Sequence, residues 1–247
     1  MTKKLTPDEL IVNYERLTKI AETYFSEDRM KKVSELLNFF EVRASTAPAS
    51  GNINYHNCYA GGYCEHVLNV IDFALKIKEN IWTDPKLDCT EEELVFSAFF
   101  HDFGKLGDRD NEYYLPEESQ WHIDKMGRLY KINPNIPFMK VPDRTLFLLQ
   151  DFGIKYTIKE FYGIKLSDGL YDESNKPYYI NYGEMSIFTA LPHVIHTADL
   201  MASKIEGSDI KKINTPKKPR IVKPKIEDID IKNLKAFDNM FDIVEEE

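Results

Sequence analysis

Hydrophobic residues recur three or four positions apart along most of this chain, which is the spacing of one face of an α-helix. Leu10, Tyr14, Leu17 and Ala21 keep this spacing behind a helix-start signal at residues 6–9. Other segments repeat the pattern, several of them behind a capping box or a proline at the first helical position. We therefore expect helices over about residues 7–21, 27–40, 63–77, 91–100, 143–152, 158 onward and 191–206.

The helical pattern fails between residues 106 and 142. Four prolines and a mixture of polar and aromatic residues, among them Tyr113, Tyr114 and Trp121, interrupt it. Long segments without a regular pattern are often lids or binding loops in compact domains. We expect an irregular, lid-like insertion here, in which a small hairpin could form. No other segment indicates a sheet, so the predicted fold class is all-α: a helical bundle with this insertion and an extended C-terminal tail.

The composition changes after Gly207. Lysines, an arginine and three prolines alternate between residues 211 and 225, which is typical of an extended, solvated linker. In the acidic tail that follows, Phe237, Met240, Phe241 and Val244 keep helical spacing. We therefore predict one domain over residues 1–206. Residues 207–247 would form a Lys/Pro linker and an acidic tail with a short amphipathic helix.

The chain has 247 residues and a net charge of −9. This charge argues against a protein held on nucleic acid by global charge, although a local basic channel stays compatible with it. The three cysteines lack paired spacing, which fits a reducing compartment. The first residues lack the apolar stretch of a signal peptide, and no run approaches the ~18 apolar residues of a membrane span. We expect a cytoplasmic protein without a membrane partner, and its oligomeric state stays open.

Candidate metal ligands occur on three of the predicted helices. His101 and Asp102 follow the apolar run of residues 94–100, His66 lies near the start of the third helix, and His196 and Asp199 share a face of the last helix. A buried carboxylate costs several kcal/mol unless something compensates it. A divalent cation would do so and would also bind the neighbouring imidazole. The set matches a bundle-core site for Mn, Fe, Co, Ni or Zn, with Mg as a further option.

The order His66, His101-Asp102, Asp199 resembles the signature of the HD superfamily of metal-dependent phosphohydrolases. The usual central form of that family, His-Asp-x-Gly-Lys, stands here at residues 101–105. Residues 47–66 resemble the segment before the first ligand in HD domains of the bacterial 3′–5′ exoribonuclease kind, and similar stretches occur in small HD proteins of bacteriophages. The resemblance covers roughly residues 40–206 and implies the helical bundle of an HD domain.

The resemblance also implies a divalent metal, manganese among the candidates, held by His66, His101, Asp102 and Asp199. His196 is a further candidate ligand. Binuclear relatives commonly carry a histidine where this chain has Ser167. We therefore expect one ion in preference to two.

The implied reaction is hydrolysis of a phosphate ester or anhydride of a nucleotide by metal-activated water. Lys105 would neutralise the phosphate, and Asp102 would hold the metal at the reacting group. Glu65 and Asp168 are candidates for proton transfer or for positioning the water. The candidate substrate contacts are Lys105, Arg43, His56, Trp121 and His193.

Alternatives stay open for several of these residues and for the function. Arg43, Glu65 and Asp168 could belong to ion pairs or helix caps, and each candidate histidine outside the four-ligand set could be structural. A 3′–5′ exonuclease-like phosphodiesterase is one alternative function. Another is a nucleotide-binding or metal-binding regulatory module with low turnover, which would bind its ligand without hydrolysing it.

Overall fold

The computed structural model describes residues 3–180, 187 and 189–207. Contacts divide the chain into residues 1–211 and 212–247. The predicted acidic tail with its short helix, and the linker beyond Gly207, lie outside the described residues.

Local sequence explains where several helices begin. The helices α1 (Pro7–Tyr24), α4 (Glu91–Phe100) and α7 (Ile158–Lys165) follow Thr6, Thr90 and Thr157. Each threonine hydroxyl accepts a hydrogen bond from the N–H three residues later, and the glutamate at that position accepts one from the threonine N–H. The other main helices are α2 (Glu27–Thr46), α3 (Gly62–Lys76), α6 (Val141–Asp151) and α9 (Leu191–Glu206). The predicted all-α fold is confirmed.

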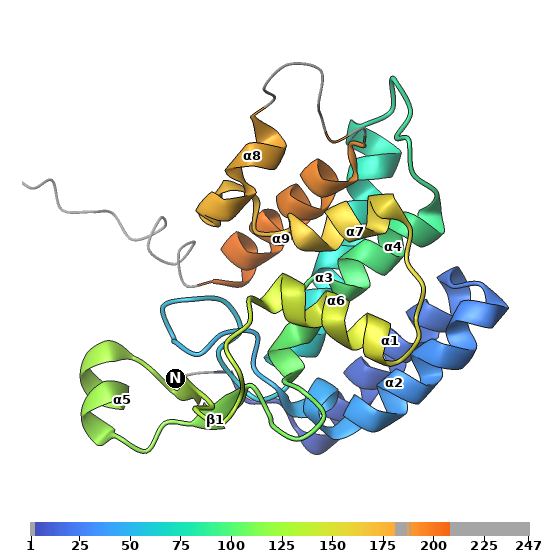
Figure 1. Cartoon of the computed structure of the whole chain (residues 1–247). Helices are drawn as coiled ribbons and strands as arrows, with labels where there is room; N and C mark the ends of the chain where they lie inside the picture. Colours follow the sequence, from blue (N-terminus) through green and yellow to red (C-terminus); the bar gives the residue numbers. More distant parts are fainter. Residues whose placement is uncertain (1–2, 181–186, 188, 208–247) are drawn as a thin grey trace, which may run out of the picture. The chain divides into compact units, whose positions relative to one another are not determined.

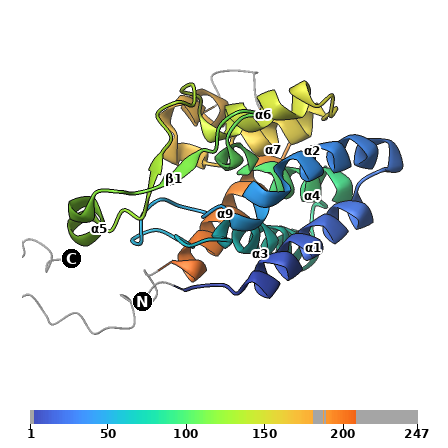
Figure 2. The same ribbon diagram turned by 90° about the horizontal axis from the view of Figure 1, so that it is seen from below.

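The helix α3 lies at the centre of the bundle, where it packs against α4, α9, α1 and α2 (Figure 1). The helices α1 and α2 lie side by side in both views (Figure 2). The helix α4 packs against α3 and α7, and its residues from Leu94 to Phe100 are all buried. This explains why six of the seven residues from 94 to 100 are apolar, because a helical segment enclosed on all sides has no polar face. Burial of α4 carries the two residues that follow it, His101 and Asp102, into the interior.

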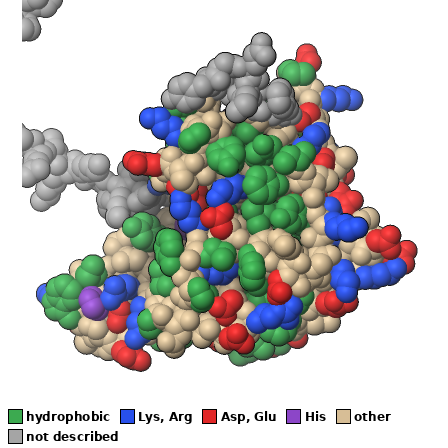
Figure 3. All heavy atoms as spheres, in the orientation of Figure 1, with side chains coloured by type: hydrophobic (Ala, Val, Ile, Leu, Met, Phe, Trp, Pro, Cys, Tyr) green, Lys and Arg blue, Asp and Glu red, His purple; other side chains and the backbone are tan. Residues whose placement is uncertain are grey.

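The segment between α4 and α6 is more ordered than its sequence suggested. Strands β1 (Tyr114–Pro116) and β2 (Tyr130–Ile132) form an antiparallel hairpin, with Tyr114 opposite Ile132, and α5 (Gln120–Met126) lies between them. In Figures 1 and 2 this insertion projects from the helices. Apolar side chains gather on its surface at the lower left of Figure 3. The Gly51 carbonyl accepts hydrogen bonds from the N–H groups of Leu129 and Tyr130, so the insertion is tied to the loop after α2.

Short elements complete the described part of the chain. They are a π-helical turn at Ile77–Ile81, 3-10 turns at Phe103–Leu106, Gly169–Tyr171 and Glu173–Asn175, and the helix α8 (Lys176–Tyr179). Within the described residues, every helix is too short or too polar to cross a membrane.

Candidate metal centre

Four predicted ligands from three helices meet at one point. His66 lies in the second turn of α3, His101 caps the C-terminus of α4, Asp102 opens the following 3-10 turn, and Asp199 lies within α9. The His66 Nε2 atom is 3.1 Å from Asp199 Oδ1, 3.5 Å from Asp102 Oδ2 and 3.4 Å from His101 Nε2. His101 Nε2 is 3.5 Å from Asp102 Oδ2 and 4.0 Å from Asp199 Oδ1. Both imidazoles are buried.

The hydrogen bond made by Nδ1 of each imidazole determines whether Nε2 carries a proton. His101 Nδ1 lies 2.7 Å from the Ala98 carbonyl oxygen, which only accepts, so Nδ1 carries the proton. His66 Nδ1 lies 2.9 Å from Glu206 Oε2 and likewise donates to it. In the neutral rings both Nε2 atoms therefore present lone pairs toward each other and toward two carboxylates. These lone pairs and negative charges repel one another unless a positive charge lies between them.

The pKa values of the clustered residues also show that the site favours positive charge. Burial lowers the pKa of His66, but hydrogen bonds to Asp199 and Glu206 outweigh burial and raise it to about 10. Burial also lowers the pKa of His101, yet the charge of Asp102 raises it overall. The pKa of Asp102 lies well below its ordinary value because Lys105 and His101 outweigh the effect of burial. Protons or one divalent cation can supply the missing charge, and the two imidazoles and two carboxylates are the ligand types that transition metals bind. His66, His101 and Asp102 lie close enough together to hold one metal ion, and Asp199 Oδ1 lies 3.1 Å from His66 Nε2.

Lys105 lies beside the cluster. Its Nζ donates to Asp102 Oδ2 at 2.6 Å, and its side chain is largely buried. Burial lowers the pKa of Lys105, but the charge of Asp102 outweighs burial and raises it, so the ammonium stays charged. A fixed positive charge next to the metal ligands is suited to binding a phosphate oxygen.

Asp168 and His196 lie on another side of the cluster. Together with Asp199 they line a small pocket with a volume of about 190 Å³. Burial and the charge of Asp102 raise the pKa of Asp168, which makes this carboxyl group easier to protonate. The His196 Nδ1 donates to the Ser167 carbonyl oxygen at 2.8 Å, so its Nε2 is the nitrogen left for a ligand. Ser167 itself is buried.

His56 packs against the cluster from the loop after α2. Its ring centroid is 4.4 Å from that of His66, and its buried Nε2 has no hydrogen-bond partner among the described residues. Burial, followed by the charges of His66 and Lys105, lowers the pKa of His56 to about 2. The ring is therefore neutral, with one polar atom left over at the edge of the cluster.

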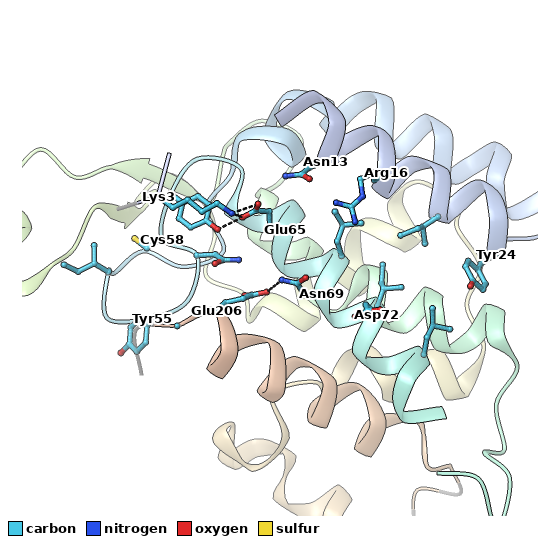
Figure 4. Close-up of a pocket in the computed structure, with 18 residues that line it drawn as sticks. Lys3, Asn13, Arg16, Tyr24, Tyr55, Cys58, Glu65, Asn69, Asp72 and Glu206 are labelled. Carbon is cyan, nitrogen blue, oxygen red and sulfur yellow. Dashed lines mark hydrogen bonds and ion pairs between the residues drawn. The ribbon is translucent and has the colours of Figure 1, made fainter. Parts of the chain in front are cut away.

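One residue of the site was missed by the sequence analysis. The Glu206 side chain is only 6% exposed; its Oε2 accepts from His66 Nδ1 at 2.9 Å and its Oε1 accepts from Asn69 Nδ2 at 2.6 Å. A carboxylate in this position orients a metal-binding histidine and fixes its tautomer. The available signal was the spacing of Glu206, seven residues after Asp199 and thus on the same face of α9. Figure 4 shows Glu206 and Asn69 together at the edge of a large pocket.

Glu65 faces this large pocket, which has a volume of about 1080 Å³ and lies between α1, α3 and residues 53–59. The Lys3 Nζ donates to Glu65 Oε1 at 2.7 Å, and the Tyr59 hydroxyl donates to Glu65 Oε2 (Figure 4). Adjacent helix residues point about 100° apart, so Glu65 and His66 face different surroundings. The ion-pair interpretation that the sequence left open describes the contacts of Glu65.

Of the other predicted substrate residues, two have partners within the protein and one is exposed. The Arg43 guanidinium donates to the carbonyl groups of Leu106, Asp108 and Asn111, so it holds the chain after the 3-10 turn. Trp121 on α5 is 61% exposed. The His193 ring packs edge-on against Tyr179, with 5.3 Å between the ring centroids. These contacts account for Arg43 and His193 without a substrate, and the substrate role of each residue stays a prediction.

Comparison with known proteins gives a partial match. The chain is 30% identical over 99 residues to the dihydroneopterin 2′,3′-cyclic phosphate phosphodiesterase of Methanocaldococcus jannaschii. The match covers 37% of this chain and 40% of that protein, so the chain spans about two fifths of the relative's length. No family model matches, and no solved structure matches. The similarity gives weak support to a relation with phosphodiesterases, and membership of the HD superfamily stays a prediction.

Proposed function

We propose that this protein is a metal-dependent phosphohydrolase that cleaves a phosphate ester or anhydride of a nucleotide. One observation carries the proposal: two imidazole lone pairs and two carboxylates converge at a buried point, next to the ammonium group of Lys105. His66, His101, Asp102 and Asp199 would hold the cation. A bound divalent cation would supply a water of lowered pKa and offset charge on the attacked phosphate.

The chain's own residues supply the rest of the chemistry. Lys105 binds a non-bridging phosphate oxygen and keeps the phosphate against the cluster. Burial and the charge of Asp102 raise the pKa of Asp168. This carboxyl group is therefore suited to hold a proton for the leaving oxygen. Glu206 keeps the His66 ring in the orientation that presents Nε2.

The relative favours a phosphodiester among the candidate substrates. By its name, that protein is a phosphodiesterase acting on a 2′,3′-cyclic phosphate. Cyclic nucleotides and short RNA therefore belong in the assay beside nucleoside monophosphates and triphosphates.

The test uses the full chain, stripped of metal and then reloaded with Mn²⁺, Co²⁺ or Ni²⁺. We expect turnover of at least one ester, and a loss of roughly 100-fold or more in Asp102→Asn, because a ligand matters at least as much as its orienting partner. Asp110→Asn, the same change at an exposed aspartate, is the matched control. Equal turnover by Asp102→Asn would refute the proposal. Tight ligand binding by the loaded protein without any cleavage would instead indicate the regulatory module.

A further inference from the structure

A second pocket opens on the hairpin side of the cluster, with a volume of about 710 Å³. We call it the hairpin pocket. It lies between residues 49–56 and the β1–β2 hairpin, and His56, Lys105, Tyr114 and Tyr130 are among its lining residues. Pockets of 300–1,000 Å³ commonly hold small-molecule ligands, so the hairpin pocket has room for a nucleoside-sized group.

Two of its lining residues touch the candidate metal centre directly. Lys105 Nζ is 2.6 Å from Asp102 Oδ2, and the His56 ring lies against the His66 ring. A phosphate bound by Lys105 at the cluster would therefore lie next to this pocket. The unpartnered Nε2 of His56 is a buried polar atom at this junction. Buried polar atoms ordinarily have a hydrogen-bond partner, and a ligand hydroxyl group could supply it.

Aromatic side chains form the walls of the pocket. The rings of Tyr114 and Tyr130 lie on the two strands, with centroids 6.4 Å apart and planes at 62°. Tyr55 lies at the lining from the opposite loop and is 66% exposed. Burial raises the pKa of Tyr114 to about 12, so its phenol stays neutral. Aromatic faces of this kind stack on planar heterocycles of many types, because every such ring has a π-face.

The hairpin is held in place before any ligand arrives. The Gly51 carbonyl accepts from Leu129 N–H at 3.0 Å and from Tyr130 N–H at 3.1 Å. A Cβ atom at Gly51 would lie 2.8 Å from the Tyr130 carbonyl oxygen and 3.3 Å from Tyr114 Cε1, so only glycine permits this close approach. A pocket with walls fixed in this way loses little entropy on binding.

We propose that the hairpin pocket binds a planar aromatic heterocycle, a nucleobase or a pteridine, that carries the phosphate ester held at the cluster. This inference deepens the proposed function, because it names the substrate class of the same site. It assigns the contact with the organic part of the substrate to Tyr114 and Tyr130, whereas the sequence analysis named Trp121 as a candidate substrate contact.

Equilibrium binding tests this without requiring turnover. The probes are adenosine 5′-monophosphate, a pterin phosphate and ribose 5-phosphate, titrated into the Mn²⁺-loaded full chain by calorimetry. We expect the first or the second to bind roughly 5-fold to 150-fold more tightly than ribose 5-phosphate, which is the range of one stacking contact. The tighter of the two identifies the heterocycle as nucleobase or pteridine.

Variants then locate the effect. Tyr114→Leu should remove most of the preference for the heterocycle and leave ribose 5-phosphate binding unchanged, while Tyr114→Phe should retain the preference because it keeps the ring. Phe138→Leu, an aromatic removal at a 94% exposed position outside the pocket lining, is the matched control and should bind like the wild type. Circular dichroism and a thermal melt verify that each variant is folded.

Two results would overturn the inference. One is equal affinity of the wild type for ribose 5-phosphate and both heterocyclic probes. The other is an equal loss of affinity for all three probes in a folded Tyr114→Leu variant, which would show that Tyr114 does not act on the heterocycle. Failure of the proposed function is a separate result: Tyr114-dependent binding by a protein that cleaves no ester would leave the pocket assignment standing and the hydrolase refuted.

Discussion

Glu206 provides a sharp test of the metal centre, because it contacts His66 at Nδ1, the ring nitrogen that does not face the other three candidate ligands. Glu206→Gln keeps the shape of the side chain and removes its charge. The carboxylate accepts from His66 Nδ1 at 2.9 Å and is only 6% exposed, so water screens the contact little. Hydrogen bonds to charged groups contribute about 1.5–3 kcal/mol. We expect divalent metal affinity to fall by about 10-fold to 100-fold, as is usual for an orienting partner.

The affinity is measured by competition with a chromophoric chelator, using Mn²⁺ and Zn²⁺. Glu79→Gln makes the same change at an exposed position of the π-helical turn and should bind metal like the wild type. Asn69→Ala removes the hydrogen bond to the other oxygen of Glu206 while it leaves the charge in place. It should cost only about 1 kcal/mol, or roughly a 5-fold loss of affinity.

An unchanged affinity in Glu206→Gln would refute the reasoning, because the tautomer and orientation of His66 would then not depend on this carboxylate. A thermal melt of the metal-free variant separates loss of metal affinity from loss of folded structure. If Glu206→Gln and Asn69→Ala weaken metal binding equally, the charge of Glu206 is not the cause.

Three further predictions follow from the contacts of other residues. Burial lowers the pKa of His66, but the carboxylates around it raise that pKa to about 10. A cation must displace this proton, so metal affinity should rise at least about tenfold per pH unit between pH 6.5 and 9 in calorimetric titrations, and more steeply wherever His101, whose pKa is also raised, is protonated. A flat profile would count against His66 as a ligand. Lys105→Met should lower kcat/KM by about 10²-fold to 10³-fold without weakening metal affinity; parallel losses would give Lys105 a structural role. Arg29→Leu should destabilise the fold by about 3–5 kcal/mol in urea unfolding, because Glu160 is fully buried and pairs with Arg29 at 2.7 Å. Lys31→Leu, at an exposed ion pair, should change stability by less than about 0.5 kcal/mol.

The helical elements could be predicted because their causes are local. Thr90 and Glu93 stand three residues apart, and their capping box forms within one turn whatever lies elsewhere in the chain. The start of α9 at Leu191-Pro192 follows from the fixed backbone angle of proline. The hairpin was less certain from the sequence, because its strands have three residues each and pair across more than a dozen positions. Such pairing depends on the loop at Gly51, which lies far away in the sequence.

The candidate site, too, was predictable only in part from local sequence. The sequence by itself determined which residue types could bind a metal. It also determined that His101 and Asp102 follow a buried helical segment together, because residues 94–100 are apolar except for Ser97. Only the tertiary structure decided that Nε2 of His66 meets Nε2 of His101 and the two carboxylates, that Glu206 supports His66, and that Arg43 and Glu65 have other partners. The physical reason is that a helix propensity or a cap involves neighbours in sequence, whereas a ligand cluster depends on how α3, α4 and α9 pack, and packing is set by contacts between residues far apart in the chain.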